Sequence, residues 1–119
     1  MKKIDGQSAS DIVLFGALGD LSRRKLLPAL YQLDNAGLLH PDSRIVGAAR
    51  QDLDLKAFTS FVNDNLNEFV KEGLNQEVHE RFLNRLVFQK LDFREASSFN
   101  DLATALDGGH DVRVYYFST

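Results

Sequence analysis

Short apolar runs alternate with amphipathic stretches along this chain, and no other feature of the sequence limits the fold so strongly. The runs are rich in β-branched and aromatic residues and predict buried strands at residues 11–15, 44–48, 87–91 and 112–117. Between them, apolar residues at helical spacing predict helices at residues 20–36, 55–72, 76–85 and 92–106. Strands joined by helices in this order predict an α/β fold, namely a Rossmann-like doubly wound parallel sheet.

The chain stops two residues after the last predicted strand. Four parallel strands are about half to two-thirds of a doubly wound sheet. We therefore expect the sheet to be truncated after its fourth strand. On this expectation residues 1–119 are an incomplete N-terminal domain.

The predicted helices carry start signals and one irregularity. Pro28 removes a backbone donor and crowds the preceding turn, so we expect a kink or a late helix start there. Asn75 is the predicted N-cap of the third helix, and Asp92 with Glu95 has the spacing of a capping box for the fourth. The predicted inward residues of the first and fourth helices are Leu26, Leu27, Leu30, Leu33, Ala96, Phe99, Leu102, Ala103 and Leu106.

Composition excludes several classes of function. The chain has no cysteine, which excludes disulfides, thiolate metal sites and cysteine nucleophiles. Its net charge of −3 gives no electrostatic footprint for nucleic acid and no polybasic membrane anchor. No apolar stretch approaches the ~20 residues of a membrane span, and no apolar signal segment follows the N-terminal lysines. We expect a cytoplasmic protein that binds neither nucleic acid nor membrane.

The first predicted strand runs directly into the segment Gly16-Ala17-Leu18-Gly19-Asp20-Leu21, and a helix follows. Gly16 would permit a tight turn, and Gly19 would let the backbone approach a pyrophosphate at the helix N-terminus. The spacing is not the common G-x-G-x-x-G, because Leu18 stands at the second glycine of that pattern. On spacing alone, a nucleotide-binding turn and an ordinary strand–helix turn both stay open.

Basic residues at two places bear on the ligand. Arg23, Arg24 and Lys25 stand in the first turns of a helix, where cations oppose the helix dipole and a nearby anion would remove the conflict. Arg50 follows the second predicted strand, where NAD-binding folds place an acid against the ribose. An arginine there offers a fork of donors to a 2′-phosphate and points to NADP. An exposed loop arginine is the alternative interpretation.

Asp92 and Phe93 follow the third predicted strand, at the edge where open parallel sheets bind ligands. They are candidates for the cofactor site, although a helix cap explains Asp92 as well. The histidines (His40, His79 and His110) have no partner acid at a convincing spacing and are expected at the surface. We therefore assign no catalytic residue and no metal ligand.

Residues 11–33, DIVLFGALGDLSRRKLLPALYQL, resemble the opening strand, G-x-x-G-D-L turn and first helix of the glucose-6-phosphate dehydrogenase family. The similarity continues at residues 37–39, 45–50, 91–92 and 115–117. The family commonly has Ser, Thr or Lys where this chain has Leu18, which implies a lost polar contact to the phosphate. Ser22 replaces a usual alanine and implies an added hydrogen bond.

The resemblance implies an NADP-dependent enzyme of the pentose phosphate pathway, a homodimer or homotetramer at full length, that oxidises glucose 6-phosphate to 6-phosphogluconolactone. It implies that Arg50 holds the 2′-phosphate and that Asp92 and Phe93 lie against the adenosine. The resemblance also implies that residues 1–119 are an incomplete N-terminal NAD(P)-binding domain and that the catalytic and dimerisation domain is absent from this chain. The family's base and phosphate-binding lysines would fall beyond Thr119, so this chain alone is expected to be inactive. The residues implied to wrap the pyrophosphate and adenosine ribose are Gly16, Ala17, Leu18, Gly19, Asp20, Leu21, Ser22 and Arg23.

Two other functions stay open at this point. A stand-alone, non-enzymatic nucleotide-binding module would explain why these residues contain no catalytic constellation. A small flavodoxin-like receiver domain has only Asp92, at the end of a strand, in its favour.

Overall fold

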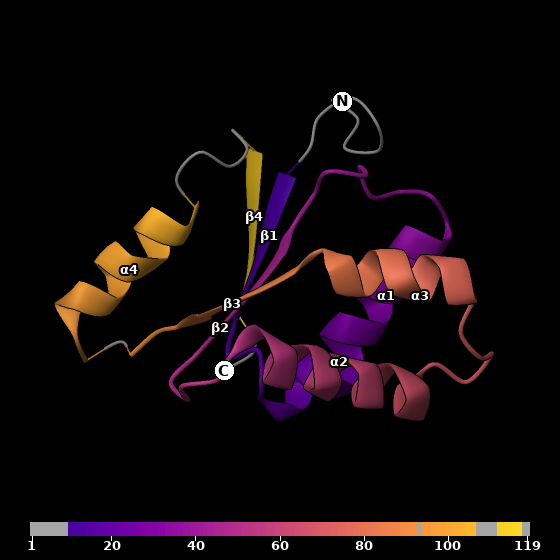
Figure 1. The fold of residues 1–119 in the computed structure, drawn as a ribbon, viewed down its shortest axis with the longest axis horizontal. Coiled ribbons are helices and arrows are strands. Elements are labelled where there is room, and N and C mark those ends of the chain that lie inside the picture. Colours follow the sequence, from indigo (N-terminus) through magenta and orange to yellow (C-terminus); the bar gives the residue numbers. More distant parts are fainter. Residues whose placement is uncertain (1–9, 93, 107–111, 118–119) are drawn as a thin grey trace.

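A parallel sheet forms the centre of the computed structural model, which describes residues 10–92, 94–106 and 112–117 (Figure 1). Within these residues the strand order is β3-β2-β1-β4, and each neighbouring pair is parallel. The strands are β1 (Ser10–Phe15), β2 (Ile45–Ala49), β3 (Leu86–Lys90) and β4 (Val112–Phe117). Strand order reverses at β1, and doubly wound sheets bind ligands at the carboxyl ends of the strands near such a reversal.

Helices cover both faces of the sheet. They are the π-helical turn η1 (Ser22–Leu26), α1 (Leu27–Asn35), α2 (Leu55–Phe69), α3 (Gln76–Asn84) and α4 (Ala96–Leu106). In Figure 1, α1, α2 and α3 lie on one side of the strands and α4 lies on the other. In the described part of the chain, no helix has the length and apolar character that crossing a membrane requires. The predicted doubly wound α/β fold is confirmed, whereas truncation after the fourth strand stays a prediction.

The side chains of β1 alternate between two hydrophobic cores. Ile12 and Leu14 belong to the cluster that includes residues of α1, α2 and α3. Val13 and Phe15 belong to the opposite cluster, with the two leucines of α4. Successive side chains of a strand point to opposite faces, so a strand covered on both sides must be apolar throughout. This requirement explains the unbroken apolar run from which the strand was predicted.

Three residues predicted to face inward are exposed instead: Leu33, Ala96 and Ala103. In α1 the inward place next to Leu33 belongs to Asp34, which is fully buried because arginines bind it there. Among the described side chains of α4, the buried ones are Ser98, Leu102 and Leu106, four residues apart, since alanines carry too little apolar area to set the buried face. The side chain of Phe99 lies outside the described residues.

The first helix accommodates Pro28 through a wide turn. The Leu27 amide donates to the Ser22 carbonyl, five residues earlier, and this bond closes the π-helical turn. Regular α-helix then begins at Leu27 with Pro28 in its first turn, where the missing amide costs little. The segment is helical from Asp20 onward, so the helix does not start late, and the irregularity expected near Pro28 takes the form of a π turn.

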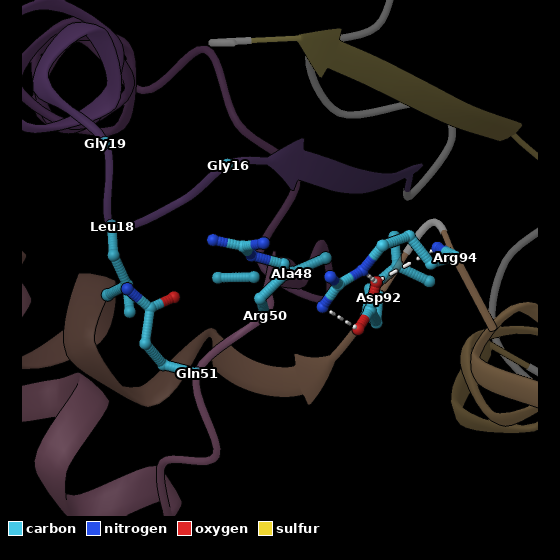
Figure 2. A pocket seen from close by; sticks show the side chains of 10 residues that line it. Gly16, Leu18, Gly19, Ala48, Arg50, Gln51, Asp92 and Arg94 are labelled. Carbon is cyan, nitrogen blue, oxygen red and sulfur yellow. Dashed lines mark hydrogen bonds and ion pairs between the residues drawn. The ribbon is translucent and has the colours of Figure 1, made fainter.

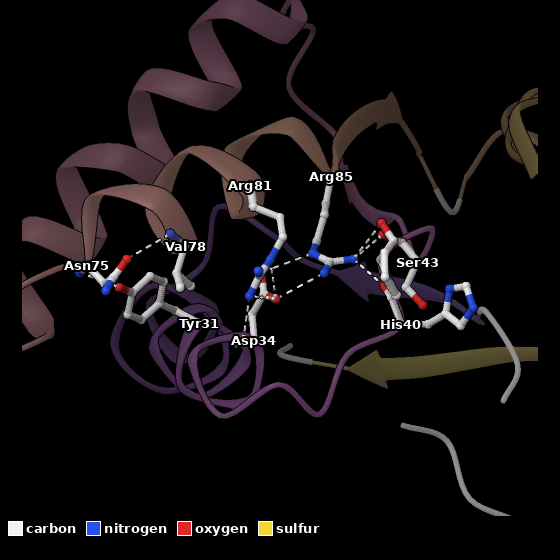
Figure 3. A network of polar contacts seen from close by, with 9 residues as sticks. Tyr31, Asp34, His40, Ser43, Asn75, Val78, Arg81 and Arg85 are labelled. Carbon is white, nitrogen blue, oxygen red and sulfur yellow. Dashed lines mark hydrogen bonds and ion pairs between the residues drawn. The ribbon is translucent and has the colours of Figure 1, made fainter. Parts of the chain in front are cut away.

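A buried ion pair joins α1 to the segments that precede β2 and β3 (Figure 3). Arg85 donates from Nε and Nη2 to the two carboxylate oxygens of Asp34, each at 3.0 Å, and Arg81 Nε donates to the same carboxylate at 3.0 Å. Arg85 Nη1 donates to the carbonyls of His40 at 2.6 Å and Ser43 at 2.8 Å. The Arg85 guanidinium is thus satisfied by partners from two segments, as a buried charge requires.

A second acid–arginine pair lies at the same edge of the sheet. Arg44 donates from Nε at 3.0 Å and Nη2 at 2.8 Å to Asp11, which is fully buried in β1. These hydrogen bonds raise the pKa of the Arg44 guanidinium above its ordinary value. The Ser10 amide also donates to Ser43 Oγ at 2.9 Å. Side chains therefore hold the amino ends of β1, β2 and β3 together.

Gly47 lets α2 lie close to the sheet, and its substitution tests this packing. A methyl group at Gly47 would overlap the ring of Phe58, which is fully buried and packs against the rings of Phe61 and Phe88. Gly47→Ala is expected to lower the free energy of unfolding by about 1–3 kcal/mol, as overpacking does, measured by urea denaturation. Phe58→Leu in the Gly47→Ala background should recover part of the loss. Unchanged stability in Gly47→Ala would contradict the close approach.

Candidate dinucleotide-binding site

A pocket of about 450 Å³ opens at the carboxyl ends of β1, β2 and β3 (Figure 2). The three loops that follow these strands form its wall, because parallel strands end at the same edge of the sheet. The lining residues are Gly16, Leu18, Gly19, Ala48, Ala49, Arg50, Gln51, Leu91, Asp92 and Arg94. The fold therefore brings the glycine turn, Arg50 and Asp92 to one cavity, although they lie far apart in the sequence.

The chain turns sharply at Gly16, immediately after β1. Its φ of 74° lies in the left-handed region, which favours glycine. The amides of Gly16 and Ala17 both donate to the Ala48 carbonyl, at 2.9 and 3.1 Å, and the Gly19 amide donates to the Gly16 carbonyl at 2.9 Å. No hydrogen bond joins the Leu18 amide to another described residue. This backbone donor at the pocket wall is thus open to an anion.

The other candidates of the turn lie outside the lining. Ala17 is fully buried in the core, while Asp20 and Leu21 are exposed. Ser22 is buried, and its hydroxyl has no hydrogen-bond partner among the described residues. A polar atom in that condition is unusual, since buried hydroxyls are normally paired.

The basic residues after the turn are held by neighbouring groups. Asp20 Oδ1 accepts from Arg23 Nη2 and Arg24 Nε, each at 3.1 Å. Arg23 Nη1 lies 3.8 Å from the Glu68 carboxylate, and its guanidinium stands 5.5 Å from the centre of the Phe69 ring. Asp20 therefore offsets the repulsion between these cations and the helix dipole without a ligand. The structure directs Arg23 toward α2 and not into the pocket lining.

Arg50 is the first residue after β2, and its exposed side chain lies at the pocket (Figure 2). Among the described residues, no hydrogen bond or close ion pair engages its guanidinium. The Leu91 amide donates to the Ala49 carbonyl at 2.7 Å and so ties the end of β3 to the end of β2. This bond keeps Arg50 near Asp92, and the Arg50 cation stays open to an anionic ligand.

Asp92 is nearly buried and closely held. Its carboxylate accepts from Arg94 Nε at 3.1 Å and Nη2 at 3.0 Å, and also from the Arg94 amide at 3.0 Å. These bonds, with a smaller contribution from the charge of Arg50, lower the pKa of Asp92 from 3.8 to about 2. The Asp92 amide donates to Ser98 Oγ at 3.1 Å, which fixes the loop to α4. Asp92 is therefore ionised at any physiological pH.

The capping box predicted at Asp92 and Glu95 is wrong. The Asp92 carboxylate binds Arg94, whose guanidinium and amide supply three donors, and the Asp92 amide binds Ser98 in place of the Glu95 side chain. Phe93, the other candidate of this loop, lies outside the described residues. Sequence reasoning also missed Gln51 and Arg94 as lining residues, although Arg94 stands only two positions after Asp92.

The low pKa of Asp92 can be measured directly. Its carboxyl carbon should titrate near pH 2 by NMR, and Arg94→Gln should raise that pKa toward 3.8 because the side-chain hydrogen bonds are lost. Since the folded pKa lies below the ordinary one, the pair stabilises the fold above pH 3.8, and this contribution disappears as the pH falls toward 2. Arg24→Gln, outside the pocket, serves as the control. A pKa near 3.8 without any substitution would contradict the described contacts.

Comparison with known proteins identifies the family. Residues 13–119 match the family model described as glucose-6-phosphate dehydrogenase, NAD binding domain. The chain is 44% identical over 110 residues to glucose-6-phosphate 1-dehydrogenase of Dickeya dadantii, an alignment that covers 92% of this chain and 22% of that protein. The corresponding protein of Mycolicibacterium smegmatis is 42% identical over 114 residues, which cover 91% of this chain and 23% of that protein. The chain thus spans about a quarter of the length of these relatives.

Solved structures agree with this assignment. The crystal structure of glucose-6-phosphate 1-dehydrogenase from Mycobacterium avium superposes with a TM-score of 0.79 at 26% identity, covering 94% of this chain and 24% of that one. A glucose-6-phosphate dehydrogenase in complex with glucose 6-phosphate superposes with a TM-score of 0.80 at 25% identity, covering all of this chain and 25% of that one. The resemblance noted in the sequence is confirmed, and the receiver-domain alternative is wrong. The chain belongs to the glucose-6-phosphate dehydrogenase family and corresponds to its NAD-binding domain.

Proposed function

We propose that the chain is the NADP-binding domain of a glucose-6-phosphate 1-dehydrogenase, an enzyme that oxidises glucose 6-phosphate at C1 to 6-phosphogluconolactone. The observation that carries the proposal is that the glycine turn and Arg50, whose guanidinium has no hydrogen bond or close ion pair among the described residues, open onto the same pocket. NADP, when bound, accepts the hydride removed from the sugar. The residues described above bind and orient this cofactor and exclude water from it.

The donor set of the pocket fits a dinucleotide phosphate. Gly16 has no side chain to block the approach of a pyrophosphate, and the Leu18 amide offers it a backbone donor. The Leu18 side chain is apolar, so the backbone and not this side chain supplies the contact. The Ser22 hydroxyl, which has no hydrogen-bond partner among the described residues, lies outside the pocket lining and is not assigned to the ligand. Of residues 16–23, the three that line the pocket, Gly16, Leu18 and Gly19, would therefore lie against the pyrophosphate.

The choice of NADP over NAD rests on the end of β2. NAD-binding folds place an acid there to accept a hydrogen bond from the ribose 2′-hydroxyl. This chain places Arg50 there, and a guanidinium binds a phosphate through two parallel donors. Asp92, and with it Phe93, would then border the adenosine from the neighbouring strand.

The remainder of the reaction is assigned to sequence outside these 119 residues. We assign no general base among the described residues, and no group of three metal-ligating side chains forms there. The family relatives are about four times longer, which leaves room for a catalytic and dimerisation domain. We propose accordingly that the complete enzyme is a cytoplasmic homodimer or homotetramer that takes glucose 6-phosphate as its substrate.

Substitution of Arg50 tests the proposed cofactor. In the gene product that carries this chain, Arg50→Gln is expected to raise the Kd of NADP by about ten- to hundredfold, since hydrogen bonds to charged groups contribute about 1.5–3 kcal/mol. The Kd of NAD should change by less than about threefold, because NAD lacks the 2′-phosphate. Isothermal titration calorimetry measures both values. Arg24→Gln, an exposed arginine outside the pocket, is the matched control, and equal affinity of the unsubstituted protein for NADP and NAD would contradict the proposal.

Because cofactor binding is assigned to this chain and catalysis to sequence outside it, residues 1–119 alone are predicted to be inactive. Purified residues 1–119 should not reduce NADP in the presence of glucose 6-phosphate, because hydride transfer needs a positioned base and substrate. Absorbance at the nicotinamide band measures this, and the intact mass of the native gene product shows how much sequence accompanies the domain. Turnover by the 119-residue chain would contradict this assignment. A native mass of 13.4 kDa would favour a stand-alone binding module.

A further inference from the structure

Three charged side chains line one side of the proposed adenosine pocket. Arg50 follows β2, and Asp92 and Arg94 follow β3. Figure 2 shows Arg94 joined to the Asp92 carboxylate, with the Arg50 side chain at the same pocket. The charge of Arg50 acts on Asp92, so the two groups are electrostatically coupled across the ends of the strands.

Asp92 presents a difficulty for a site that binds a 2′-phosphate. It is an ionised carboxylate beside the cation that would hold the phosphate. A carboxylate in such a position repels the phosphate and cancels the attraction of Arg50, because like charges at close range disfavour each other. With Arg50 and Asp92 alone, the pocket would carry no net charge and would have no electrostatic reason to prefer NADP.

We propose that Arg94 makes the pocket selective for a 2′-phosphate by neutralising Asp92. This inference rests on the proposed NADP-binding function and adds a specificity-determining residue to it. Arg94 holds the carboxylate through two parallel guanidinium bonds, which restores one net positive charge to the group. Arg94 acts on the phosphate through Asp92 and is a positioning residue.

The geometry supports this role over a direct contact. The Nε and Nη2 atoms of Arg94 are both used by Asp92, and the Arg94 amide binds the same carboxylate, so main chain and side chain turn toward Asp92 together. The Asp92 side chain is 11% exposed, whereas that of Arg94 is 76% exposed. The arginine therefore covers the carboxylate while its outer face stays hydrated.

A set of five proteins tests the inference: the unsubstituted gene product, Arg94→Gln, Asp92→Asn, the Asp92→Asn/Arg94→Gln double variant, and Arg50→Gln. The Kd values of NADP and NAD are measured for each, at low and high salt. Asn at position 92 keeps the oxygen that accepts from the Arg94 amide, so the loop can retain its turn. The readout is the ratio of the NADP and NAD affinities. A general loss of folding or of pocket shape weakens the binding of both cofactors and leaves this ratio unchanged.

Arg94→Gln is expected to lower the preference for NADP by about tenfold, as exposure of one unpaired charge near a phosphate does. Asp92→Asn should raise it, because the repelling charge is gone and the cation remains. The double variant should return to within about twofold of the unsubstituted protein, since its net local charge is the same. High salt should shrink all of these differences.

Two results would overturn the inference. One is an unchanged preference in Arg94→Gln. The other is a double variant as weak for NADP as Arg94→Gln alone, because that result means that Arg94 contacts the phosphate directly. If Arg94→Gln does not fold, the Asp92→Asn variant tests the inference. A preference of Asp92→Asn for NADP that does not exceed that of the unsubstituted protein contradicts it. The proposed function fails separately, through equal NADP and NAD affinity in the unsubstituted protein and no effect of Arg50→Gln.

Discussion

The rest of the structure depends on the buried pairing of Asp34 with Arg85. Arg85 is the residue before β3, and its carbonyl accepts from the Ile45 amide at the start of β2. Because its guanidinium also binds Asp34 in α1 and the carbonyls before β2, it sets where both strands begin. Both strands have five residues and pair without offset, from Ile45 with Leu86 to Ala49 with Lys90. Arg50 follows β2 directly and Asp92 is the second residue after β3, so this register brings both side chains to the same pocket.

The two edges of the sheet use acid–arginine pairs in opposite ways. At the amino edge, Asp11 and Asp34 are fully buried, and their arginine partners compensate charges that water cannot reach. Such pairs specify an arrangement more than they add stability, because removing charges from water is costly. At the carboxyl edge, the Asp92–Arg94 pair borders a cavity, and no described residue forms a close ion pair with the neighbouring Arg50. Acid–arginine pairs thus hold the strands together at one edge of the sheet, and one such pair lines the pocket at the other edge.

The sequence predicted the features that are local. The strands follow from apolar runs, the turn from Gly16 and Gly19, and the candidate phosphate-binding residue from Arg50 directly after a strand. It did not predict the burial of Asp34, because helical periodicity assigns a polar residue to the surface, and its arginine partner lies 51 residues away. Arg94 was missed because a nearby Glu95 suggested a helix cap for Asp92. In both cases a contact with a particular arginine determines where the acid lies. A periodic sequence pattern does not indicate such a contact.

The π turn stands between two parts of one continuous segment, the glycine turn that lines the pocket and the helix α1 that packs on the core. Each residue of an α-helix advances its direction by about 100°, so the extra residue of a π turn rotates everything after it by about that angle. The orientation of the glycine turn is thereby uncoupled from that of the stripe formed by Leu27, Leu30 and Tyr31, which must face the core. The wide turn thus changes the angle around the helix axis at which the residues after it point. It lets the glycine turn and the apolar stripe of the segment each take its own direction around the helix.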